Sequence, residues 1–203
     1  RTLKSASGWA PDGRSLLYVE AGDVGLLSRG TGGWTSRPLL ATPASEECAS
    51  VSPDGRWMVY SSDETGRREA YLQRFPGLGA KVQVSTGGGF MPRWAPDGKA
   101  LYFIDPGSGQ IMVVPVTTSP TFAAGQPRVL FSTSGFVIDG FHTSFELTPD
   151  GRQFLFTAPR QNNAAAVQPA LVQPVASRKA CASLLSGSAA KVPFGASRPS
   201  LLM

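Results

Sequence analysis

The sequence predicts an all-β protein in which one short group of strands recurs. Three observations support this fold class: a turn tripeptide that occurs four times, an apolar block that follows each copy, and a high content of turn-forming residues, with 23 Gly and 17 Pro among 203 residues. Frequent turns suit many short strands better than long helices. No stretch shows a convincing 3.6-residue apolar period, so we expect little helix.

The repeated turn is Pro-Asp-Gly, whose copies begin at positions 11, 53, 96 and 149 and therefore lie 42, 43 and 53 residues apart. Proline presets φ for the first central position of a type I turn, aspartate suits the second, and glycine takes the left-handed conformation that follows. Each copy is predicted to join two short antiparallel strands through a bulged hairpin. The residues assigned to this structural role are Pro11, Asp12, Gly13, Pro53, Asp54, Gly55, Pro96, Asp97, Gly98, Pro149, Asp150 and Gly151.

An apolar block follows each turn in the same register. The four blocks are residues 16–18, 58–60, 101–103 and 154–156. They are continuous rather than alternating, which is typical of strands whose two faces are both covered. Sheets stacked around an axis cover their inner strands in this way, and a repeat of about 40–45 residues with four short strands is the blade of a β-propeller. We expect the aromatic side chains of the repeat, including Trp9, Trp57 and Trp94, to lie between blades.

The repeats divide the chain into a propeller over residues 1–175 and a low-complexity basic tail over 176–203. The tail is rich in Ala, Ser, Gly and Pro, and we expect it to be poorly ordered. A six-bladed ring at this period needs roughly 260 residues. Because the chain starts at Arg1, already inside patterned sequence, we expect a partial propeller of about four blades, a fragment of a longer protein. The blades are predicted near 5–46, 47–89, 90–140 and 141–175.

Within the blades, strands are predicted to run antiparallel and in chain order. Those of the second repeat are expected at 48–52, 56–62, 69–75 and 81–85. Those of the third repeat are expected at 91–95, 100–105, 110–116 and 128–132. Those of the fourth repeat are expected at 142–147, 152–157 and 170–175.

The charge distribution argues against a nucleic-acid partner. The net charge is +5, but residues 1–160 carry 15 Lys and Arg against 14 Asp and Glu. The excess of basic residues therefore belongs to the tail and does not describe a basic binding face. The longest apolar runs, such as residues 111–116, are far too short to span a bilayer, so we expect no membrane span in this segment.

The repeat resembles a known family once it is written out. Trp-Ala-Pro-Asp-Gly-Lys at 94–99, followed by Leu-Tyr-Phe at 101–103, is similar to the WD40-like repeat of the TolB propeller family. The resemblance covers roughly residues 5–175. It implies a propeller fold, and a periplasmic or extracytoplasmic location if the chain is like the family.

A narrower resemblance lies in the middle of the chain. Tyr-Leu-Gln-Arg-Phe-Pro-Gly at 71–77, Ser-Thr-Gly-Gly-Gly at 85–89 and Met-Val-Val-Pro-Val at 112–116 are similar to the C-terminal propeller region of bacterial serine/threonine protein kinases. This resemblance implies a sensor or scaffold region of such a kinase. Two alternatives stay open: an accessory propeller that gates a prolyl-oligopeptidase-type peptidase, and a periplasmic TolB-like protein-interaction domain.

Motifs that carry chemistry point away from an enzyme. The chain has neither the kinase motifs that hold ATP and metal nor the Gly-x-Ser-x-Gly elbow of a peptidase, and His142 is its single histidine. Asp12, Asp54, Asp97 and Asp150 fall on separate blades, so each is expected to bind its own turn amides rather than a shared metal ion. We predict no catalytic residues, cofactor or metal, and we interpret residues 87–89 as a loop between blades.

The function predicted from the sequence is therefore binding of an unidentified protein or peptide. Loops between strands face the ends of a propeller, where a partner has access to them. By this position logic, the candidate partner-contact residues are Glu64, Arg67, Arg68 and Arg93.

Overall fold

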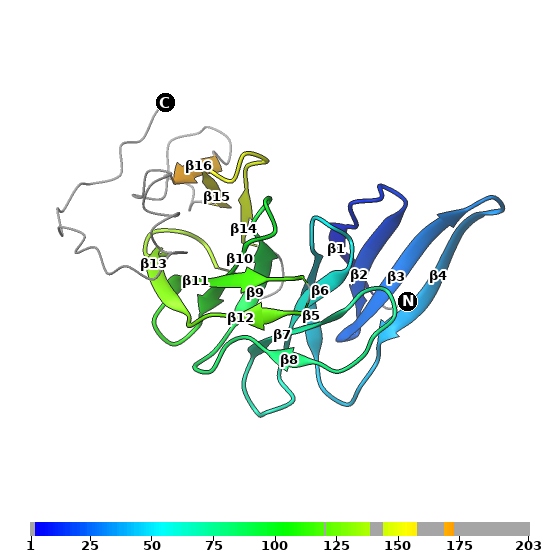
Figure 1. Cartoon of the computed structure of the whole chain (residues 1–203), viewed down its shortest axis with the longest axis horizontal. Helices are drawn as coiled ribbons and strands as arrows, with labels where there is room; N and C mark the ends of the chain where they lie inside the picture. Colours follow the sequence, from blue (N-terminus) through cyan, green and yellow to red (C-terminus); the bar gives the residue numbers. More distant parts are fainter. Residues whose placement is uncertain (1–2, 120, 139–143, 158–168, 173–203) are drawn as a thin grey trace.

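The computed structural model describes residues 3–119, 121–138, 144–157 and 169–172, and within these ranges it consists of strands and turns without a helix. The predicted all-β fold class is confirmed. The strands form antiparallel sheets in which consecutive strands pair, and the sheets follow one another across Figure 1 in chain order. Each sheet contains one Pro-Asp-Gly turn and is a propeller blade, numbered here from 1 to 4.

Blades 1 and 2 each contain four strands paired in chain order. The strands of blade 1 are β1 (Lys4–Trp9), β2 (Ser15–Glu20), β3 (Asp23–Gly30) and β4 (Gly33–Leu40). The strands of blade 2 are β5 (Glu46–Val51), β6 (Trp57–Ser62), β7 (Glu69–Arg74) and β8 (Val82–Gln83). The fourth strand of blade 2 is shorter than the predicted 81–85, because only Val82 and Gln83 pair with β7.

Blade 3 differs from this pattern at its outer edge. Its strands are β9 (Phe90–Trp94), β10 (Ala100–Asp105), β11 (Gln110–Thr117), β12 (Ala123–Ala124) and β13 (Arg128–Ser132). The long strand β11 pairs with β13 along its first half and with β12 at its end. The predicted outer strand at 128–132 is present, and the short strand β12 is an addition that the repeat did not indicate.

Blade 4 is described by three strands: β14 (Phe145–Leu147), β15 (Phe154–Thr157) and β16 (Pro169–Val172). Parts of the predicted strands at 142–147 and 170–175 lie outside the described residues, as does His142. The predicted poorly ordered tail over 176–203 also lies outside the described residues.

The apolar block of each blade lies on its second strand, and in blades 2 and 3 it packs against both neighbouring blades. In β6, Met58 and Tyr60 join the apolar cluster shared with blade 1, whereas Trp57 and Val59 join the cluster shared with blade 3. Strand side chains alternate between faces, so a continuous apolar run is required when both faces are covered. The same alternation divides β10 between blade 2 on one side and blade 4 on the other.

One face of blade 1 lacks this cover. Trp9 is 57 % exposed, whereas Val51 and Trp94, its equivalents in blades 2 and 3, are 8 % and 6 % exposed. The prediction that Trp9 lies between blades is wrong. Its side chain packs on Trp34 of the same sheet, and among the described residues no neighbouring sheet covers that face.

The Pro-Asp-Gly turns have one geometry in all four blades. The glycine has φ between 63° and 70°, and its amide donates to the carbonyl three residues earlier. The aspartate accepts a hydrogen bond from the amide two residues later, as in the 2.8 Å bond from the Arg14 amide to Asp12. The hydrogen bond from the Arg14 amide lowers the pKa of Asp12, and that from Thr148 lowers the pKa of Asp150.

A close approach in the loop between blades 2 and 3 leads to the first prediction. A Cβ on Gly89 would lie 2.7 Å from the Ala70 backbone nitrogen and closer still to the Ser85 hydroxyl, whereas a Cβ on Gly87 would meet no atom within 4 Å. Gly89→Ala should therefore lower the free energy of unfolding by about 1–3 kcal/mol through overpacking. Gly87→Ala should be neutral or stabilising by up to about 1 kcal/mol. Urea denaturation of both variants checks this; equal effects would contradict it.

A buried carboxyl at the start of β5 leads to the second prediction. Glu46 is 2 % exposed; its Oε1 accepts a hydrogen bond from Thr42, and its Oε2 has no partner. Burial raises the pKa of Glu46, so the folded chain holds this proton more tightly than the unfolded chain. The resulting stability is present below the unfolded pKa and is lost as the pH rises through the folded pKa.

Glu46→Gln should therefore raise the melting temperature more at pH 7 than at pH 4. Glu20→Gln, which removes a partly exposed carboxylate paired with Lys4, is the matched control and should change stability little. Thermal unfolding by circular dichroism across pH 4–8 measures the difference. A larger gain for Glu46→Gln at pH 4 than at pH 7 would show that the sign is wrong.

Candidate functional site

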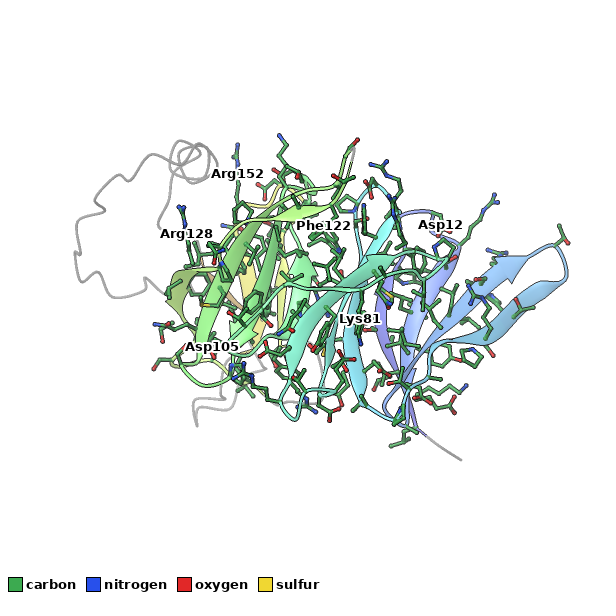
Figure 2. All side chains as sticks on the ribbon, turned by 60° about the horizontal axis from the view of Figure 1, so that its bottom comes forward. Asp12, Lys81, Asp105, Phe122, Arg128 and Arg152 are labelled. Atoms are coloured by element: carbon green, nitrogen blue, oxygen red, sulfur yellow. The ribbon has the colours of Figure 1, made fainter. Side chains whose placement is uncertain are left out.

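The blades expose two ends that differ in their loops. One end carries the Pro-Asp-Gly turns. The other end, called here the loop end, carries the turns between the second and third strands of the first three blades, at 21–22, 63–68 and 106–109. Figure 2 shows Asp12 and Arg152 at the upper, Pro-Asp-Gly end and Asp105 at the lower, loop end.

A hollow of about 390 Å³ opens at the loop end where segments of blades 2 and 3 meet the chain after β13. Its floor is formed by side chains fixed in the sheets, since Phe90 is 5 % exposed and Ile104 is 2 % exposed. The residues that line it are Arg68, Phe90, Ile104, Pro106, Gly109, Thr133 and Ile138. The lining thus combines apolar side chains with the guanidinium of Arg68 and the hydroxyl of Thr133.

Arg68 is the charged residue of this hollow. Its Nη2 lies 2.9 Å from Oε2 of Glu47, and its guanidinium carbon lies 4.8 Å from the centre of the Phe90 ring. These two contacts hold the guanidinium in place, yet the side chain stays 38 % exposed. A planar guanidinium held in this way offers paired donors to a carboxylate or a carbonyl.

The other two predicted contact residues of this loop are engaged within the molecule. Arg67 pairs with Glu69 and donates a 2.7 Å hydrogen bond to the Thr86 carbonyl, and Glu64 pairs with Lys81. Both still lie on the loop end with side chains that are 59 % and 26 % exposed, so these bonds orient Arg67 and Glu64 without closing them to a partner. Their role in partner contact stays a prediction.

The glycine loop at 87–89 connects β8 of blade 2 with β9 of blade 3, as the sequence predicted. Its Gly88 amide donates a 3.1 Å hydrogen bond to Glu69, a carboxylate that is 0 % exposed and that also accepts from the Ser85 hydroxyl. The anion bound by this loop is therefore the carboxylate of Glu69, a side chain of the protein itself. This bond fixes the connection between the two blades.

Arg93 lies apart from the loop, in the innermost strand of blade 3. Its Nη1 donates to the carbonyl of Cys48 in blade 2 at 3.1 Å, and its Nε lies 3.5 Å from Oε2 of Glu146 in blade 4. Burial lowers the pKa of Arg93, and Glu146 opposes this shift. With 4 % of its side chain exposed, Arg93 joins three neighbouring inner strands. The prediction of a partner contact at Arg93 is untested.

The hollow contains residues that sequence reasoning did not select. Phe90 and Ile104 belong to apolar strand positions, and Thr133 follows β13 and donates its hydroxyl to the Gly109 carbonyl at 2.8 Å. Nothing in their local sequence separates them from core residues. Phe90 and Ile104 are paired at the loop-end termini of β9 and β10. The register of these two strands is the one signal that places the two residues together.

In the described part of the chain, the acidic, Cys and His side chains do not gather in groups of three or more that could hold a metal ion. Among the described residues, there is also no helix of the length and hydropathy needed to cross a membrane.

Comparison with known sequences gives limited coverage. The chain matches no family model. It is 27% identical over 100 residues to an uncharacterized protein of Agrobacterium fabrum, a match that covers 48% of this chain and 34% of that protein.

Solved structures give a clear match for the fold. A putative TolB from Agrobacterium tumefaciens superposes with a TM-score of 0.63 at 25% identity, covering 85% of this chain and 58% of that one. TolB from Acinetobacter baumannii gives 0.58 at 18% identity, covering 85% and 41%. A puromycin-hydrolyzing peptidase of Mycobacterium tuberculosis gives 0.57 at 14% identity, covering 85% and 30%. The chain spans less than two thirds of each of these proteins, and it has the fold of a TolB-like β-propeller.

Proposed function

We propose that this chain is a non-catalytic binding module whose stacked blades present the loop end to a protein or peptide. The observation that carries the proposal is the hollow beneath Arg68, in which a positioned guanidinium stands over a rigid apolar floor. TolB-like neighbours support a propeller module of this kind. The proposal includes the absence of catalytic residues and of a cofactor.

The chemistry of the hollow indicates the kind of segment it accepts. Pro106 and Ile138 offer contact to an apolar side chain, and Arg68 offers hydrogen-bond donors to a carboxylate beside it. Because Glu47 and the Phe90 ring already hold the guanidinium, binding costs little side-chain entropy at this position. A peptide with an apolar residue next to an acidic residue or a C-terminal carboxylate satisfies both groups.

In a longer protein, we propose that the module serves as the sensor or scaffold region of a bacterial serine/threonine kinase. The resemblance at 71–77, 85–89 and 112–116 supports this role. The complete open reading frame tests it, because kinase motifs upstream are required. A serine-containing elbow downstream would assign the chain to a peptidase instead, and a secretion signal directly before the propeller would assign it to a periplasmic interaction protein.

The binding role is tested by selecting a displayed library of random peptides on the immobilised chain and measuring the winners by fluorescence anisotropy. Enriched peptides should carry an apolar residue beside a carboxylate. Arg68→Gln should weaken the binding of these peptides at least about tenfold. Arg74→Gln is the matched control, since Arg74 also stands over an aromatic ring, that of Trp57, but at the other end of its strand. Peptides that bind both variants equally would remove the hollow from the proposal.

The non-catalytic part of the proposal has its own test. Purified chain should neither transfer phosphate from ATP to a protein substrate nor cleave a panel of fluorogenic peptides, because its sequence has neither the kinase motifs that hold ATP and metal nor the Gly-x-Ser-x-Gly elbow of a peptidase. A heat-inactivated sample sets the background for both assays. Turnover above that background that co-purifies with the chain would refute this part of the proposal and leave the binding test unaffected.

A further inference from the structure

The charged side chains of the described residues are divided unequally between the two ends of the blades. These residues include 13 Lys and Arg and 13 Asp and Glu, so their charges sum to zero. The loop end carries four of the cations and eight of the carboxylates, whereas the Pro-Asp-Gly end carries seven cations and four carboxylates. Figure 2 shows Arg128 and Arg152 toward the upper, basic end and Asp105 at the lower, acidic end. The neutrality of the blades is therefore the sum of two oppositely charged ends.

All seven cations of the Pro-Asp-Gly end are exposed. Four of them directly follow the glycine of a Pro-Asp-Gly turn, and three lie where strands β3, β7 and β13 reach this end. Arg56 and Arg152 each pair with the aspartate of their own turn, at 2.8 and 3.7 Å. The cations without an ion pair in the described part of the chain are Arg14, Arg29, Arg74, Lys99 and Arg128. Five positive charges at this end are thus open to a partner.

The turn aspartates leave these charges open because their oxygens bind backbone amides. Oδ1 of Asp12 accepts hydrogen bonds from the Arg14 amide at 2.8 Å and from the Ser15 amide at 2.9 Å. Asp97 accepts a hydrogen bond from the Lys99 amide at 3.0 Å. The carboxylates therefore hold the turns, and the side chains of Arg14 and Lys99 have no carboxylate paired with them.

The loop end has the opposite balance. Each of its four cations pairs with a carboxylate of the same end: Lys4 with Glu20, Arg67 with Glu69, Arg68 with Glu47, and Lys81 with Glu64. The four carboxylates that remain are at least partly buried, and they are Asp23, Glu46, Asp63 and Asp105. Charge that is both exposed and unpaired is therefore concentrated at the Pro-Asp-Gly end, where it is positive.

Arg74 is the cation of this end that the structure positions best. Its guanidinium carbon lies 4.1 Å from the centre of the Trp57 ring, and that ring is fixed between blades 2 and 3 with 6 % of the residue exposed. Phe122 packs on the same indole, with ring centres 5.4 Å apart. A guanidinium that already rests on a rigid ring loses little side-chain entropy when it pairs with a carboxylate.

We propose that the Pro-Asp-Gly end is a second interaction surface, which binds an acidic segment of a protein partner. The carboxylates of such a segment can pair one by one with separate cations, although an aspartate lies beside each turn. A DNA duplex carries a phosphate charge about every 1.7 Å and would place some phosphates against these aspartates. A membrane surface is bound by clusters of about four to eight Lys and Arg, without acids among them. The surface is separate from the hollow, which lies at the opposite end.

The test measures binding of a fluorescent peptide of about ten glutamates to the full chain by fluorescence anisotropy. Binding should weaken at least about tenfold between about 20 and 200 mM NaCl, because exposed ion pairs are screened by salt. Arg74→Gln combined with Lys99→Gln should weaken binding about fivefold at the lower salt concentration. The matched control, Lys4→Gln with Lys81→Gln, lowers the net charge equally but at the loop end, and it should change binding less than about twofold.

Three outcomes would overturn the proposal. The first is absence of binding at about 20 mM NaCl, where screening is weak. The second is equal weakening by the two double variants, which would show attraction to net charge alone; the basic tail over 176–203 is present in both and contributes equally. The third is tighter binding of phosphatidylserine vesicles or of a short DNA duplex through the same two cations, which would assign the surface to a membrane or to nucleic acid. Because the glutamate peptide has no apolar side chain for the hollow, each outcome leaves the test of the proposed function unaffected.

Discussion

The structure depends on one constraint: the second strand of a blade that stands between two others must be covered on both faces at once. On the second strands of blades 2 and 3, Met58, Val59 and Leu101 are 0 % exposed because a neighbouring sheet covers each face. Burial of this kind stabilises by roughly 25 cal/mol for each Å² of apolar surface removed from water. A blade with one neighbour gains about half of that cover on its second strand, so the stability of each repeat is tied to the repeats beside it.

This constraint explains why the architecture could be predicted from the sequence. The Pro-Asp-Gly turn marks the position of a hairpin, and the continuous apolar run after it indicates that both faces of the following strand are covered. Strand β10 occupies the predicted residues 100–105, and the Pro-Asp-Gly turns have the predicted hydrogen bonds. Burial of single residues could not be predicted in the same way. Trp9 and Trp94 share a place in the repeat but differ in exposure by about fifty percentage points, because the neighbouring sheet decides exposure.

The candidate site was only partly predictable, for a similar reason. Arg67 and Arg68 are adjacent and chemically identical, yet one is drawn to buried Glu69 and the Thr86 carbonyl while the other stands over Phe90. The acceptors of both guanidinium groups, Glu69, the Thr86 carbonyl and Glu47, lie in blade 2 and the segment that follows it, whereas Phe90 begins blade 3. Position in a loop indicates access to solvent, but the direction of a guanidinium is set by partners most of which are distant in the sequence.

The same stacking explains how a binding surface can be rigid although it is made of loops. Glu69 is wholly buried and accepts a hydrogen bond from the Gly88 amide. The loop between blades 2 and 3 is therefore held by a residue of strand β7 rather than by contacts within the loop. Arg93 ties the inner strands of three blades through the Cys48 carbonyl and Glu146. Because both the loop between blades 2 and 3 and the inner strands are fixed in this way, Phe90 and Arg68 keep their positions without a ligand. The surface proposed for binding is therefore preformed, and the loop residues on it can vary without disturbing the clusters beneath.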